Sequence, residues 1–211
     1  NRDMKAFIFD LDGVIVFTDR YHYQAWKALA DDLQIPFDET VNDRLRGVGR
    51  MESLDIILEK ADKAYSLKEK TAFAEKKNKI YKELLKQMQP SDVSDEVRKT
   101  LEELRKRGHR LAIGSSSKNT KFILKQVGIE DYFDAISDGT NITKSKPDPE
   151  VFVKAAEFLG EEATNCIVIE DAKAGIDAAK AADMMAVGIG DAAGYEKTDV
   201  AITSFSQLLD I

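Results

Sequence analysis

Short apolar runs alternate with helix-like stretches through the second half of the chain, and one more apolar run opens it. The runs predict strands at residues 6–9, 110–114, 166–170, 185–190 and 200–204. Apolar residues recur at helical spacing in residues 96–108, 118–128 and 174–183. Strands that alternate with helices in this way are typical of βα repeats, so the pattern predicts a parallel sheet covered by helices.

Residues 18–89 follow a different pattern, with no β-branched runs and with apolar residues at helical spacing. A long charged helix is expected over residues 66–88, with Phe73, Ile80 and Leu84 toward a core. The α/β pattern resumes at Pro90. We therefore expect an α/β core made of residues 1–17 and 90–211, with residues 18–89 inserted as a helical cap.

The composition narrows the class of protein. The 211 residues are 43% hydrophobic with a net charge of -7, which favours a globular protein and argues against a nucleic-acid binder. No apolar run is long enough for a membrane span, and the opening residues lack the pattern of a signal segment. With a single cysteine, Cys166, no internal disulfide can form, so a cytoplasmic protein is expected.

Acidic residues follow two of the predicted strands. Asp10 and Asp12 come after the first apolar run, and Glu170 and Asp171 end another. Ligands of open α/β sheets bind at the carboxyl ends of the strands, where carboxylates from two strands would converge. Carboxylate oxygens suit a hard cation, so the sequence predicts a Mg²⁺ site at this edge.

Two further polar segments complete the inventory for phosphoryl transfer. Residues 115–119 (SSSKN) follow a predicted strand, in a turn whose backbone N–H groups could bind a phosphate, although such residues are often simple helix caps. Lys146, which we expect to precede a third strand, adds a positive charge, although a lone lysine is ordinarily solvated. The chain thus offers, in this order, a nucleophile, hydrogen-bond donors for a phosphate, a cation and a metal site. This combination indicates phosphoryl transfer.

The segments DLDGV, GSSSKN, KSKPDP and IEDAKAGI resemble, in order and spacing, the haloacid dehalogenase superfamily. The resemblance covers nearly the whole chain and implies a Rossmann-like parallel-sheet core with an inserted cap of the four-helix-bundle type. It implies that Asp10 is the nucleophile and Asp12 the general acid and base. It also implies that Mg²⁺ is held by Asp10, the backbone carbonyl of Asp12 and Asp171, with Glu170 supporting that shell. The transferring phosphate would be bound by Ser115, Ser116 and Lys146.

Within that superfamily, residues 21–35 and 42–58 are similar to the cap of the β-phosphoglucomutase branch. This likeness implies a Mg²⁺-dependent isomerase that interconverts β-D-glucose 1-phosphate and D-glucose 6-phosphate through an aspartyl phosphate and a 1,6-bisphosphate. The substrate contacts that it implies are Thr18, His22, Trp26, Arg46, Gly47, Val48, Arg50, Ser53, Lys77, Ser117, Lys118 and Asn119. A monomer is expected. Val16 and Phe17 depart from the branch, which usually has threonine and aspartate there.

Three alternatives remain open from the sequence. The first is a phosphatase of small sugar phosphates with the same core chemistry, and the second is a mutase on another sugar phosphate. The third is a non-catalytic protein that uses the fold to bind a phosphosugar or a partner. Asp12 beside Asp10 argues against the third, because a binding module needs no acid next to a nucleophile.

Overall fold

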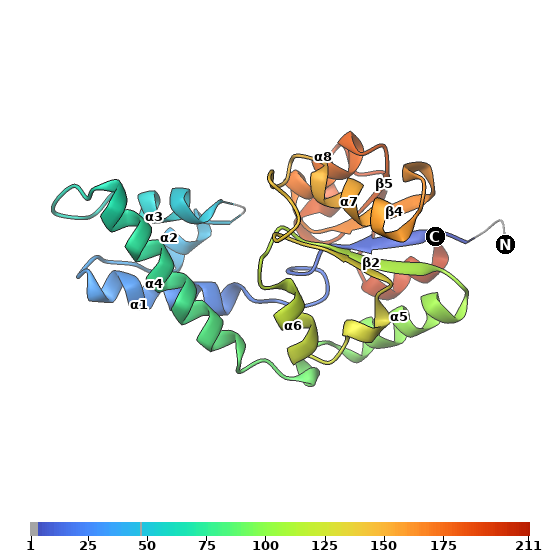
Figure 1. Ribbon diagram of the computed structural model, residues 1–211, viewed down its shortest axis with the longest axis horizontal. Coiled ribbons are helices and arrows are strands. Elements are labelled where there is room, and N and C mark those ends of the chain that lie inside the picture. The colour runs from blue at the N-terminus through green and yellow to red at the C-terminus, as the bar shows by residue number, and fades with distance from the viewer. Residues whose placement is uncertain (1–3, 47) are drawn as a thin grey trace. The chain divides into compact units, whose positions relative to one another are not determined.

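Six strands form a parallel sheet in the computed structural model, which describes residues 4–46 and 48–211. The strands are β1 (Ala6–Phe9), β2 (Arg110–Gly114), β3 (Ala135–Ser137), β4 (Cys166–Glu170), β5 (Met185–Gly188) and β6 (Val200–Ala201). Their order across the sheet is β3-β2-β1-β4-β5-β6, and every neighbouring pair is parallel. The first strand therefore lies at the centre, with β2 and β4 beside it (Figure 1).

Helices cover both faces of this sheet (Figure 1). The helices are α5 (Asp95–Lys106), α6 (Thr120–Gln126), α7 (Glu150–Leu159) and α8 (Lys173–Ala181). Ala6 and Ile8 pack in the cluster that contains the apolar residues of α7 and α8. Phe9 points to the opposite face, where its ring stacks on Phe205 at 5.6 Å between ring centroids. A strand buried on both faces needs a continuous apolar run, which is what the sequence shows.

Short 3-10 helices connect these elements: η1 (Pro90–Asp92), η2 (Glu130–Tyr132), η3 (Ala163–Asn165), η4 (Gly190–Gly194) and η5 (Phe205–Asp210). The expectation that a strand follows Lys146 is wrong, because α7 follows it. Strand β3 precedes Lys146 and escaped the sequence pattern because it has only 3 residues. The strand expected at residues 200–204 is likewise reduced to Val200–Ala201.

The chain divides into two compact units, one made of Asn1–Phe17 with Met88–Ile211 and the other of Thr18–Gln87. The second unit is helical and consists of α1 (Asp19–Asp32), α2 (Glu39–Asp43), α3 (Arg50–Leu58) and α4 (Leu67–Leu85). The chain returns to the first unit at Met88, close to the Pro90 expected from composition. None of the described helices is both long enough and apolar enough to cross a membrane.

The inner face of helix α4 is centred beside the one that its apolar residues predict. Ala74, Lys77, Tyr81 and Leu85 are buried, whereas Phe73, Ile80 and Leu84 are only half-buried. Ser66 begins the helix by accepting a hydrogen bond from the Glu69 amide, so this end is satisfied locally. The buried face is instead set by the packing of α4 against α1, which brings a lysine into the interior of the unit.

Candidate active site

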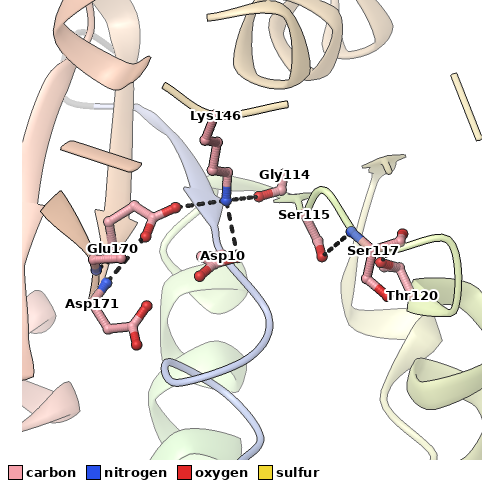
Figure 2. Close-up of polar contacts among 9 residues, drawn as sticks. Asp10, Gly114, Ser115, Ser117, Thr120, Lys146, Glu170 and Asp171 are labelled. Atoms are coloured by element: carbon pink, nitrogen blue, oxygen red, sulfur yellow. Dashed lines mark hydrogen bonds and ion pairs between the residues drawn. The ribbon is translucent and has the colours of Figure 1, made fainter. Parts of the chain in front are cut away.

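Three carboxylates and one amine meet at the carboxyl ends of β1 and β4. Asp10 follows β1, and its amide donates to the carbonyl of Ile169 in β4, which places it next to Glu170. The Lys146 Nζ donates to Asp10 Oδ1 at 3.0 Å, to Glu170 Oε2 at 2.6 Å and to the Gly114 carbonyl at 3.0 Å (Figure 2). The structure therefore brings together Asp10, Lys146 and the adjacent Glu170 and Asp171 from three places in the sequence.

Two glycines make room for these carboxylates. Gly13 has φ +85, and a Cβ at this position would overlap the Asp171 carboxylate. A Cβ on Gly175, in the first turn of α8, would overlap the Glu170 carboxylate in the same way. Any other residue would have to displace an acid of the cluster, so the two glycines are part of the site. Both lie in the segments that carry the family resemblance, DLDGV and IEDAKAGI.

The cluster holds more negative charge than its one lysine balances. Burial and then the neighbouring Asp10 carboxylate raise the pKa of Glu170, and the same two causes raise the pKa of Asp171 to about 7. Burial opposes the charge on Lys146, but the carboxylates of Asp10 and Glu170 outweigh it and raise the Lys146 pKa. An additional positive charge would therefore stabilise the ionised carboxylates of this cluster.

A divalent cation fits this environment. Carboxylate oxygens of Asp10, Glu170 and Asp171 lie within 4.8 Å of one another. They are hard oxygen donors on neighbouring strands, which suits Mg²⁺ better than a soft metal. Among the described residues this geometry brings together the carboxylates of three of the four expected metal ligands, whose role stays a prediction. Asp12 is expected to contribute through its backbone carbonyl, and that contribution stays a prediction.

Stabilisation by Mg²⁺ should increase with pH. Because the Asp171 carboxyl has a pKa of about 7 when folded and a lower one when unfolded, the metal-free protein loses stability as pH rises through this interval. Bound Mg²⁺ replaces the proton and removes the loss. We expect the Mg²⁺-induced rise in melting temperature to be larger at about pH 8 than at about pH 5. Thermal unfolding with and without Mg²⁺ measures this, and an equal rise at both pH values would contradict it.

The loop of residues 115–119, here called the serine loop, follows β2 beside the acid cluster. The Ser117 amide donates to Ser115 Oγ at 3.2 Å, and the Asn119 amide donates to Ser117 Oγ at 3.0 Å. Ser116 Oγ is buried and has no hydrogen-bond partner among the described residues. A buried hydroxyl without a partner costs free energy, and a hydrogen bond to a ligand oxygen at this point would offset that cost. Lys118 is exposed and Asn119 is half-buried.

The helical unit holds a second group of predicted site residues, centred on a buried lysine. The Lys77 side chain is 4% exposed, and its Nζ lies 2.8 Å from His22 Nδ1. The amine also sits 4.8 Å from the ring centroids of Trp26 and Tyr81. The Tyr81 hydroxyl donates to Thr18 Oγ1 at 3.3 Å. Lys77, an expected substrate contact, is therefore buried, and Thr18, His22, Trp26 and Lys77 form one cluster.

Burial lowers the pKa values of the two titratable groups in this cluster. Burial first, and then the nearby Arg50, lower the pKa of Lys77 to about 7. Burial, Lys77 and Arg50, in that order, lower the pKa of His22 to about 3. No carboxylate of the described residues forms an ion pair with Lys77 or Arg50. The cluster therefore presents cationic groups without an anion to balance them.

The remaining expected cap residues lie around the first turn of α3. Arg50 is exposed and donates through Nη2 to Asn78 Oδ1 at 3.2 Å. The Ser53 hydroxyl is buried and donates to the Val48 carbonyl at 3.4 Å. Arg46 is exposed and forms an ion pair with Asp43 at 3.6 Å. Gly47 lies outside the described residues.

Replacing Lys77 should flatten a pH dependence of stability. The folded Lys77 loses its proton near pH 7, whereas the unfolded lysine keeps it, so wild-type stability rises with pH above this value. Between about pH 7 and about pH 9 the rise should approach roughly 2 kcal/mol in saturating Mg²⁺, and Lys77→Met should abolish it. Urea unfolding at both pH values tests this, with the exposed Lys79→Met as control. A rise that persists in Lys77→Met would contradict the assignment.

Sequence reasoning missed Tyr81 and Asn78, two residues of α4. The Tyr81 ring packs against the Lys77 amine, and Asn78 accepts a hydrogen bond from Arg50 in α3. The ring of Tyr81 stacks on His22 at 4.0 Å between centroids, so it holds both members of the buried pair. The available signal was the helical spacing of Lys77 and Tyr81, which puts them on one face. That signal is weak in a helix rich in lysine, because most of its polar residues face solvent.

Comparison with known proteins places this site in a family. The family model of haloacid dehalogenase-like hydrolases matches residues 4–183. The β-phosphoglucomutase of Bacillus subtilis is 41% identical over 207 residues, which cover 97% of this chain and 92% of that protein. The phosphorylated carbohydrates phosphatase of Thermotoga maritima is 32% identical over 182 residues, covering 85% and 82%.

A solved structure agrees with these relatives. The crystal structure of β-phosphoglucomutase from Clostridium difficile superposes with a TM-score of 0.84 at 40% identity, covering 97% of this chain and 93% of that one. The expected Rossmann-like sheet and the resemblance to the β-phosphoglucomutase branch are confirmed by these matches. The sheet, the acid cluster with its lysine, and the family model thus agree, and the chain belongs to the haloacid dehalogenase-like hydrolase family.

Proposed function

We propose that the protein is a β-phosphoglucomutase, which interconverts β-D-glucose 1-phosphate and D-glucose 6-phosphate with Mg²⁺. The observation that carries the proposal is the acid cluster bridged by Lys146, in a chain that is 41% identical over almost its whole length to a protein of that name. The coarser conclusion, an enzyme of phosphate-ester chemistry, follows from the family. The substrate and the isomerase outcome are the proposal.

Asp10 is the proposed nucleophile. A carboxylate oxygen of Asp10 forms a bond to phosphorus while the bond from phosphorus to the sugar oxygen breaks, and Asp12 gives that oxygen a proton. Lys146 lies 3.0 Å from Asp10 and offsets the repulsion between a carboxylate and a phosphate dianion. Mg²⁺ held by Asp10, Glu170, Asp171 and the Asp12 carbonyl would supply further charge neutralisation.

The mutase cycle that we propose starts from the phosphorylated form of Asp10. The sugar 1-phosphate takes this phosphoryl group on its 6-hydroxyl, and Asp12 accepts the hydroxyl proton. The resulting 1,6-bisphosphate reorients and returns its other phosphate to Asp10, so no phosphate is lost. Ser115, Ser116 and Lys146 bind whichever phosphate is transferring. Exclusion of water is essential, because water would otherwise hydrolyse the aspartyl phosphate.

A mutase must also bind the phosphate that is not transferring. Arg50 is the proposed ligand, because a guanidinium fork suits a phosphate and Arg50 has no carboxylate partner among the described residues. Lys77 adds positive charge in the same unit when it is protonated, and the neutral His22 is a further proposed contact. The remaining proposed contacts to the sugar phosphate are Thr18, Trp26, Arg46, Gly47, Val48, Ser53, Ser117, Lys118 and Asn119.

Arg50→Ala should harm the mutase reaction far more than simple hydrolysis. We expect glucose 6-phosphate formation to fall by about 10²-fold, because a charge-assisted contact to the second phosphate is lost. Hydrolysis of a small aryl phosphate, which has no second phosphate, should change less than about threefold. The exposed Arg44, which pairs with Glu59, provides a matched control as Arg44→Ala. Equal losses in both assays would mean that Arg50 does not bind this phosphate.

A phosphatase of sugar phosphates is the second candidate, favoured by the 32% identity to the Thermotoga maritima phosphatase. ³¹P NMR of the protein with Mg²⁺ and β-glucose 1-phosphate, primed with a trace of glucose 1,6-bisphosphate, separates the two. Growth of glucose 6-phosphate without inorganic phosphate supports the mutase. Growth of inorganic phosphate supports the phosphatase. A mutase that acts on another sugar phosphate would produce neither signal. The cytoplasmic location and the monomeric state stay predictions.

A further inference from the structure

A tight turn at residues 138–141 follows β3 and lies against the serine loop. The two segments continue the pairing of β2 with β3, in which Gly114 is opposite Ser137. The Ser115 amide donates to the Ser137 carbonyl at 3.1 Å, and the Gly139 amide donates to the Ser117 carbonyl at 3.0 Å. The end of β3 therefore holds the serine loop at Ser115, and the backbone of the turn holds it at Ser117.

Gly139 brings the two backbones into direct contact. A Cβ on Gly139 would lie 2.5 Å from the Ser116 carbonyl oxygen and 2.9 Å from the Lys118 amide nitrogen. Both are backbone atoms, which cannot rotate away as the end of a flexible side chain can. The position of Ser116 and Lys118 is therefore determined by the path of the turn that packs on them.

Asp138 fixes the shape of this turn. Its side chain is fully buried, and Oδ1 accepts hydrogen bonds from the Thr140 amide at 2.9 Å and the Thr140 hydroxyl at 2.6 Å. The Asp138 amide donates to Asn141 Oδ1 at 2.8 Å, and the Asn141 side chain donates to Ser137 Oγ at 3.0 Å. Burying a carboxylate costs free energy, and the hydrogen bonds of Asp138 hold the turn in a shape that an apolar residue could not hold.

The effect of the turn on the serine loop can be followed at Ser117. Its carbonyl accepts from Thr120 Oγ1 at 2.8 Å (Figure 2). It also accepts from the Gly139 amide, so the peptide plane is held from two sides. With this plane held, Ser116 Oγ remains buried and without a protein partner among the described residues. A preorganised hydroxyl of this kind is free to donate to an oxyanion without first breaking another bond.

We infer that Asp138 is a positioning residue for phosphate binding, acting through the turn of residues 138–141 on Ser115, Ser116 and Lys118. The inference rests on the proposed role of the serine loop in the reaction. Asp138 itself contacts neither the acid cluster nor, in our proposal, the phosphate. Its loss should therefore weaken phosphate binding while Mg²⁺ binding, which belongs to β1 and β4, is unchanged.

Calorimetric titration with inorganic phosphate in saturating Mg²⁺, and separately with Mg²⁺ alone, tests this. In Asp138→Ala we expect the phosphate dissociation constant to rise at least about tenfold and the Mg²⁺ constant to stay within about twofold. Asp138→Asn keeps an acceptor for Thr140 and should restore phosphate affinity to within about threefold of wild type. Leu208→Ala, a buried change in η5, controls for general loss of stability.

The outcomes separate cleanly. Wild-type phosphate affinity in Asp138→Ala, parallel loss of phosphate and Mg²⁺ affinity, or no restoration in Asp138→Asn overturns the inference. If Asp138→Ala does not fold, the exposed Thr140→Val removes one hydrogen bond to Asp138 and should weaken phosphate binding by about threefold, and unchanged affinity again overturns it. Failure of the mutase proposal appears elsewhere, as a wild-type protein that binds phosphate but forms no glucose 6-phosphate.

Discussion

We expect Asp10→Ala to lower the rate of glucose 6-phosphate formation by at least about 10⁴-fold, because no other group replaces the attacking oxygen. Asp10, the proposed nucleophile, follows the central strand, and its Oδ1 lies 3.0 Å from Lys146 Nζ. Glu170 and Asp171 lie in the same cluster, but they belong to a different strand end and cannot move into its place. The rate is measured by ³¹P NMR with primed β-glucose 1-phosphate.

The control for Asp10→Ala is Asp131→Ala, an exposed aspartate in η2 that should leave the rate unchanged. The folded state is checked by thermal unfolding, since loss of a protein fold would imitate loss of catalysis. A variant that folds and retains the wild-type rate would exclude Asp10 as nucleophile. It would also favour the alternative in which the fold serves as a non-catalytic phosphosugar-binding module.

Lys146→Met should have the largest combined effect on stability and turnover. It removes the amine that bridges Asp10 and Glu170 and leaves two buried carboxylates without a protein cation. Breaking a buried ion pair on one side typically costs about 3–5 kcal/mol, and we expect a loss of this size in the metal-free protein. Turnover should fall by roughly 10³-fold, because the charge that offsets phosphate repulsion is lost.

Lys146→Met should also change how stability depends on pH and on Mg²⁺. The destabilisation should shrink as pH falls toward about 5, since protonation of Glu170 and Asp171 then relieves the repulsion. Saturating Mg²⁺ should recover part of the lost stability. Urea unfolding with and without Mg²⁺ measures both effects, and Lys144→Met, an exposed lysine two residues away, is the matched control. A loss of stability that is independent of pH and Mg²⁺ would point to packing instead of charge.

The helical unit shows where sequence patterns fail. Lys77 lies in a lysine-rich helix, and only its contact with His22, 55 residues away, reveals that it is buried. Similarly, the apolar residues Phe73, Ile80 and Leu84 lie at the edge of the inner face of α4, which is centred on its neighbours Lys77 and Tyr81. An amphipathic pattern reports average preference for water, whereas the buried face depends on which partner helix supplies aromatic rings to cover the amine.

The acid positions, by contrast, could be predicted from the chain alone. The run AFIF before Asp10 and the run CIVI before Glu170 are apolar at every position, because β1 and β4 are covered on both faces. The acids that follow them must then emerge at the same edge of a parallel sheet. Local sequence therefore determined the sheet, its edge and the carboxylates of the candidate metal site.

Tertiary structure alone decided how these groups are balanced. Lys146 lies 136 residues from Asp10, in a loop before α7, and nothing local indicates that its amine reaches both Asp10 and Glu170. The turn that carries Asp138 follows a strand of 3 residues, too short to leave a periodic signal. Periodicity records how each segment is covered, but the charge and hydrogen-bond balance of a site depends on which distant segments the fold brings within a few ångströms.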